Sequence, residues 1–70
     1  MERYVVDSST IREVAYDPEA TTLEVHFFHR GSYRYFDVPE FVLRAFLKAD
    51  SKGEYFNRCV ASQYRFEEIR

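Results

Sequence analysis

Between Thr22 and Phe28, apolar residues occupy every second position, beginning at Leu23. This two-residue period is typical of a strand with one buried face. A shorter alternation from Ile11 to Tyr16 predicts another strand. Residues 17–21 contain an aspartate, a proline and a threonine, and they predict the loop that joins the two strands.

A hairpin must connect this pair to the aromatic segment 32–39, SYRYFDVP, in which Tyr33 and Tyr35 lie two residues apart. In the favoured register a three-residue loop puts Gly31 in the left-handed region. Residue 28 then pairs with residue 32, and both tyrosines face the core. A slip by one residue would turn both tyrosines to the outer face. The sequence leaves these two registers open.

Two helices and a tail complete the predicted fold. After Pro39, residues 40–49 carry apolar side chains at helical spacing. Ser51 and Glu54 form the capping box S-x-x-E, which predicts a second helix over about residues 52–61. Residues 4–6 predict a short extended stretch and residues 63–70 an extended tail. The expected class is α+β: a small antiparallel meander of three strands, followed by two helices packed on one face and an extended C-terminal tail.

Composition narrows the class of protein. Seventy residues make a single domain, 1–70, and the 46% of apolar residues can supply a core by packing alone. The lone cysteine, Cys59, excludes an internal disulfide and leaves too few thiols for a zinc site. No run approaches the ~20 apolar residues of a membrane span, and no signal peptide is evident, so we expect a cytoplasmic protein.

The charge is distributed unevenly. The net charge is -2, with a sum of -4 over residues 1–28 and of +2 over residues 29–70. The whole molecule therefore does not attract nucleic acid, but its second part allows a modest basic face.

The order and spacing of several motifs resemble the KTSC domain family. These motifs are IREVAYD, LEVHF, YRYFDVP and GEYFNR, with the family's hallmark Tyr-x-Tyr at residues 33–35. The resemblance covers about residues 8–69. Arg30, where members often carry Asn, and Cys59 depart from the pattern. The family is largely uncharacterised; it occurs at the C-terminus of some lysyl-tRNA synthetases and as small stand-alone bacterial proteins, and the synthetase context implies RNA binding.

For RNA, the candidate residues are two tyrosines that could stack on bases and six cations that could contact phosphates. They are Tyr33, Arg34, Tyr35, Arg44, Lys48, Lys52, Arg58 and Arg65. The ordinary structural reading, favoured for both groups, makes the tyrosines core residues and the cations solvated surface side chains.

The alternative function is association with another protein or with a second copy. A sheet with one uncovered face would expose His26, Phe28 and Phe36, and an edge strand would be open for pairing.

Catalysis finds little support in the sequence. The two glycines form no phosphate-binding loop, and no nucleophile–base grouping appears at informative spacing. His26 and His29 are too few for a closed metal site. We therefore expect a non-catalytic module without cofactor, metal or small-molecule substrate.

Overall fold

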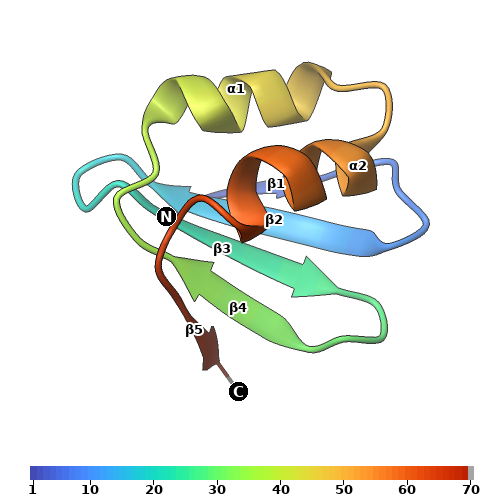
Figure 1. The fold of residues 1–70 in the computed structure, drawn as a ribbon, viewed down its shortest axis with the longest axis horizontal. Coiled ribbons are helices and arrows are strands. Elements are labelled where there is room, and N and C mark those ends of the chain that lie inside the picture. The colour runs from blue at the N-terminus through green and yellow to red at the C-terminus, as the bar shows by residue number, and fades with distance from the viewer. Residues whose placement is uncertain (70) are drawn as a thin grey trace.

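The computed structural model describes residues 1–69 as one antiparallel sheet with helices above it (Figure 1). The strands are β1 (Glu2–Val5), β2 (Ile11–Asp17), β3 (Thr22–Phe27), β4 (Ser32–Tyr35) and β5 (Phe66–Ile69). The helices are α1 (Glu40–Lys48) and α2 (Lys52–Phe56), and α2 continues directly into the π-helix η1 (Asn57–Ala61). The strand order is β1-β2-β3-β4-β5. Within residues 1–69, no helix is long and apolar enough to cross a membrane.

The α+β class is confirmed, but the expected number of strands is wrong. The sheet has five strands because the two segments expected to be extended but outside the meander both pair with it. The stretch near the N-terminus forms β1 on β2, and the tail forms β5 on β4. The tail docks because Phe66 packs its ring against Tyr33 and Tyr35, at 5.9 and 5.5 Å between ring centroids.

The β3–β4 register differs by two residues from the favoured one. Val25 pairs with Tyr33 and Leu23 with Tyr35. The loop is longer than expected, and it is closed by a 2.9 Å hydrogen bond from the Phe27 N–H to the Gly31 carbonyl. Gly31 has a φ of 84°, in the region expected for it. Because the shift is by two residues, the tyrosines keep the predicted face toward the core.

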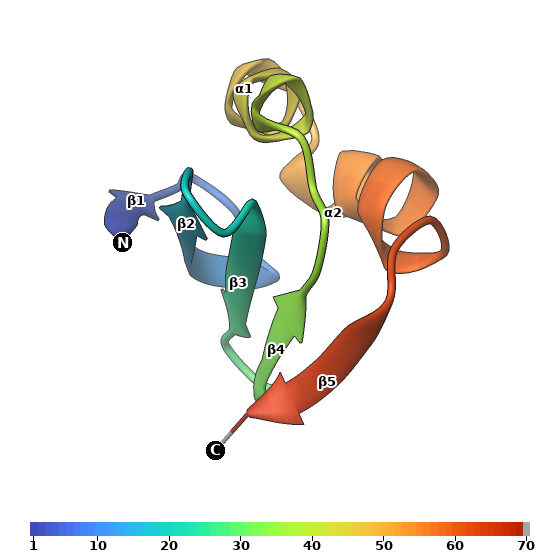
Figure 2. The ribbon, with the colours of Figure 1, turned by 90° about the vertical axis from the view of Figure 1, so that its left-hand side faces the viewer.

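The core lies between one face of the sheet and the helices, which Figure 2 shows end-on above the strands. Phe46 of α1 and Phe56 of α2 are fully buried there. Phe56 meets Phe27 and Tyr35 edge-on, at 5.2 and 5.4 Å between ring centroids. Such edge-to-face contacts add to the apolar area that the rings bury. The helices therefore cover one face of the sheet, as predicted.

The predicted capping box starts α2 at Lys52. The Ser51 hydroxyl accepts a hydrogen bond from the Glu54 N–H at 3.3 Å. The predicted span, residues 52–61, is helical throughout, although its second half is a π-helix. Phe56 and Val60 are the buried residues of this segment. Cys59, whose place on the apolar stripe of the predicted helix favours a core residue, is only half-buried.

Thr21 is a source of strain in the turn between β2 and β3. Its φ of 51° lies in the left-handed region, which a β-branched side chain disfavours. Replacing Thr21 by glycine should relieve this strain, which outweighs the greater chain entropy of glycine in the unfolded state. We expect the free energy of unfolding to rise by about 0.5–1 kcal/mol in urea denaturation.

The neighbouring Thr22 provides the control, since it is buried and lies in the first position of β3. Thr22→Gly should lower the free energy of unfolding, because glycine weakens a strand. Equal losses in the two variants would show that Thr21 is not strained.

Candidate nucleic-acid interface

The uncovered face of the sheet is charged, which corrects the expectation of an apolar surface. Glu24, almost fully buried, accepts hydrogen bonds from Arg34 at 3.1 and 3.3 Å. Arg34 also reaches Glu67 on β5 at 3.0 Å. The hydrogen bond with Glu24 is the main cause that raises the pKa of Arg34. Arg34, a predicted phosphate contact, is therefore held by two carboxylates.

Of the three residues expected to form an apolar interface, only Phe28 is exposed. His26 points its Nδ1 at the Ser32 hydroxyl, at 2.7 Å, and its buried Nε2 is 3.5 Å from a Glu24 oxygen. Phe36 is half-buried, with the guanidinium of Arg65 4.9 Å above its ring. Phe28 is exposed in the β3–β4 loop.

Ser32, His26 and Glu24 follow the order of a nucleophile, base and orienting acid. The Nε2–oxygen distance of 3.5 Å is, however, long for a hydrogen bond, and Arg34 holds the other oxygen of Glu24. The three side chains form a polar network that links β3 to β4.

The side chains of the two candidate tyrosines pack in or against the core. Tyr35 is 4% exposed, and burial raises the pKa of its hydroxyl. Tyr33 is half-buried and lies edge-on to Phe27, with 6.0 Å between ring centroids. Tyr35 cannot offer a free ring face to a base, so the stacking role predicted for this pair loses one member.

The candidate cations separate into engaged and free side chains. Arg44 is bound to Glu40 one turn earlier, at 2.6 Å, and Lys52 donates to the Ala49 carbonyl at 2.6 Å. Lys48 and Arg58 are exposed. No carboxylate in the described part of the chain lies within salt-bridge distance of either of them.

The outer side of α1 carries a feature that sequence reasoning missed. Phe41 is 72% exposed, although its position next to the apolar stripe suggested a core residue. Lys48 lies seven residues later, two helical turns on and therefore on the same side, at a rise of about 10 Å. The spacing from Phe41 to Lys48 is the signal in the sequence that could have revealed an aromatic ring and a free cation on one face.

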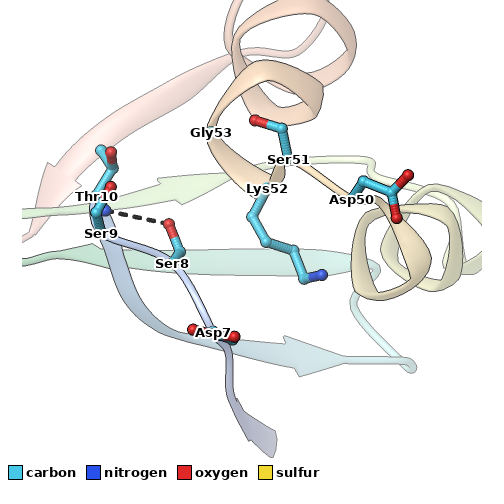
Figure 3. A pocket seen from close by; sticks show the side chains of 8 residues that line it. All are labelled: Asp7, Ser8, Ser9, Thr10, Asp50, Ser51, Lys52 and Gly53. Atoms are coloured by element: carbon cyan, nitrogen blue, oxygen red, sulfur yellow. Dashed lines mark hydrogen bonds between the residues drawn. The ribbon is translucent and has the colours of Figure 1, made fainter.

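A polar hollow of about 250 Å³ adjoins the end of this helix (Figure 3). It lies where the β1–β2 loop meets the junction of α1 and α2, and Lys52 projects beside it with its Nζ turned toward the end of α1. The Ser8 hydroxyl accepts hydrogen bonds from the N–H groups of Thr10 and Ile11, both at 3.1 Å, and so holds the loop in place. The lining residues are Asp7, Ser8, Ser9, Thr10, Asp50, Ser51, Lys52 and Gly53.

The ammonium of Lys52, bound to the Ala49 carbonyl, adds a second positive charge beside the hollow at the C-terminal end of α1. Together, Phe41, Lys48 and Lys52 define what we call the α1 face. Such a face can stack on one base and attract the adjoining phosphates. Asp50, which also lines the hollow, partly offsets the positive charge of the two lysines. The α1 face is therefore suited to a weak contact with a single strand.

Comparison with known proteins gives matches over most of the chain. The family model described as the KTSC domain matches residues 7–64. An uncharacterised protein of Stutzerimonas stutzeri is 44% identical over 70 residues, 99% of each chain. Lysine–tRNA ligase of Nostoc punctiforme is 32% identical over 63 residues, which are 90% of this chain and 11% of the ligase. The crystal structure of a KTSC domain protein from Yersinia pestis has a TM-score of 0.94 and 35% identity, covering 99% of this chain and 97% of that one.

Proposed function

Because the chain belongs to the KTSC domain family, we propose that it is a non-catalytic module that binds single-stranded RNA through the α1 face. The observation that carries this proposal is the exposed ring of Phe41 on the same side of α1 as the free cation Lys48. Base–aromatic stacking beside a cation is the usual means by which proteins hold single strands without reading their sequence.

The occurrence of the module in a longer protein supports this choice. In the Nostoc punctiforme relative, the matching segment is 11% of a protein named for its tRNA substrate. An appended module of this size can raise the local concentration of a weakly held RNA without joining the reaction. The net charge of -2 predicts that binding is weak, and the few cations of the α1 face predict a modest fall of affinity with salt.

Binding is tested with fluorescently labelled single-stranded RNA of mixed sequence, measured by anisotropy. Phe41→Leu keeps an apolar side chain but removes the stacking ring. We expect it to weaken binding by at least about fivefold, since stacking contributes ~1–3 kcal/mol per base. Phe66→Leu on β5 is the matched control and should leave the affinity unchanged. Equal losses in the two variants would contradict a role for the α1 face.

The phosphate contact is tested by the dependence of affinity on salt. Lys48→Gln should lower the slope of log affinity against log salt by about 0.7, the value for one contact to a single strand. Arg12→Gln removes the same charge from an exposed position of β2 and should leave the slope as it is. Binding that does not weaken between about 50 and 200 mM salt would rule out phosphate contacts.

Self-association is the second candidate function, and a separate observation favours it. Within residues 1–69, the sheet ends in two strands, β1 and β5, that each have one side unpaired. Unpaired strand edges are templates for pairing with another chain.

A further inference from the structure

The two edges of the sheet differ in what they expose. β1 carries Val5, which is 86% exposed, next to the salt-bridged Arg3. β5 carries two adjacent glutamates, Glu67 and Glu68. Figure 2 shows the two strands on opposite sides of the sheet. The two edges can therefore be compared as surfaces for pairing with a second copy.

The hydrogen-bond pattern identifies the free backbone groups of β1. The hydrogen bond from the Phe27 N–H to the Gly31 carbonyl shows which way the backbone groups of β3 point. The N–H and C=O groups of its odd-numbered residues point toward β4, and those of its even-numbered residues point toward β2. On β2, Glu13 and Ala15 pair with even-numbered residues of β3, so their backbone groups point toward β3. The backbone groups of Val14 and Tyr16 therefore point toward β1. The backbone groups of their partners on β1, Tyr4 and Glu2, are therefore used in pairing with β2. The N–H and C=O groups of Arg3 and Val5 therefore point to the open edge.

One antiparallel register of β1 with itself satisfies these groups. With Tyr4 opposite Tyr4 of the second copy, Arg3 and Val5 form hydrogen-bonded pairs across a two-fold axis. The exposed Val5 side chain then lies against the aliphatic stem of the opposing Arg3, and no like charges face each other. A register centred on Arg3 would set arginine against arginine and is excluded.

β5 cannot pair with itself in the same way. Every antiparallel register that keeps three or more residues of β5 paired sets Glu67 or Glu68 of one copy opposite a glutamate of the other. Like charges directly opposite each other destabilise a strand pair. These glutamates protect the β5 edge against self-pairing, as charges on edge strands do.

We propose that β1 pairs with β1 of a second copy, in the register centred on Tyr4, so that one continuous sheet runs through both copies. This inference rests on self-association, the second candidate function. Pairing of three residues of β1 from each copy buries little surface, so the dimer belongs to the weak, transient class of interfaces.

Sedimentation equilibrium of the full chain from about 10 μM to about 1 mM tests the proposal over the range of weak affinities. The unchanged chain should show a reversible monomer–dimer equilibrium. Val5→Pro removes only an edge-facing N–H and leaves the pairing of β1 with β2 in place. We expect it to weaken dimerisation at least about tenfold, the loss of more than one hydrogen bond.

A second substitution and a control make the result decisive. Val5→Lys sets a cation opposite Arg3 and should weaken the dimer as much as Val5→Pro, while both variants keep the circular dichroism of the folded chain. Glu68→Lys, on the other edge, should not weaken it. A dimer unaffected by both Val5 variants would overturn the assignment to β1 but keep self-association. A monomer at every concentration would overturn both.

Discussion

Replacing Phe46 by alanine should lower the free energy of unfolding by about 3–5 kcal/mol, the usual cost of removing a buried phenylalanine. Phe46 is 1% exposed and belongs to the hydrophobic core, with the Tyr55 ring 6.2 Å away between centroids. A domain of 70 residues has about 4–10 kcal/mol in total. We therefore expect much of the variant to be unfolded at 37 °C, as measured by urea denaturation.

The same substitution five residues earlier in α1 is the control. Phe41→Ala removes a side chain that is mostly in water and introduces a better helix former, so stability should change by less than about 0.5 kcal/mol. A comparable loss in the two variants would mean that Phe41 is packed and not free to stack on a base. The pair of variants thus tests the core and the α1 face together.

The domain should lose stability steeply above pH 10. Burial raises the pKa of Tyr16, Tyr35 and Tyr55 above the ordinary value of 10.0. Above pH 10 the unfolded chain ionises these groups while the folded chain keeps them protonated, so ionisation favours unfolding. Each tyrosine contributes a slope of up to about 1.4 kcal/mol per pH unit, from its unfolded pKa up to its folded pKa. Below pH 10 their contribution is fully present.

Two tyrosine-to-phenylalanine variants separate this titration from other groups that ionise in the same range. Denaturation at a series of pH values should show a shallower alkaline slope in both Tyr16→Phe and Tyr35→Phe. At pH 7, Tyr16→Phe should also lose about 1–2 kcal/mol, because its hydroxyl donates a 2.7 Å hydrogen bond to the buried Val38 carbonyl. An unchanged slope in both variants would refute the burial effect.

Much of the fold could be predicted from local patterns. The alternation in β3 reflects the need for an apolar face toward the core. The capping box at Ser51 reflects the need to satisfy the backbone N–H groups at the start of a helix. The edge strands could not be predicted in this way. β1 and β5 are four residues long and mostly exposed on both faces, so neither shows the alternation of a half-buried strand. They are strands only because β1 pairs with β2 and β5 pairs with β4.

The register and the candidate site depended on contacts between distant segments. Gly31 can adopt its left-handed conformation both in the expected three-residue loop and in the longer loop that is observed. The glycine alone therefore did not determine the register. Arg34 was a reasonable phosphate contact until Glu24 and Glu67, on two other strands, were placed beside it. The seven-residue spacing placed Phe41 and Lys48 on one side of α1, but the exposure of that side followed only from how α1 packs on the sheet.

The arrangement of the strands implies an order of assembly. β1 to β4 are joined in succession by loops of only four or five residues, 6–10, 18–21 and 28–31, so three hairpins can form from local contacts. β5 meets β4 only after residues 36–65, a segment of 30 residues that contains both helices. Closing so long a segment costs more chain entropy, and such non-local contacts form slowly. The aromatic strand β4 therefore remains an open edge during folding, until the helices have packed and β5 covers it.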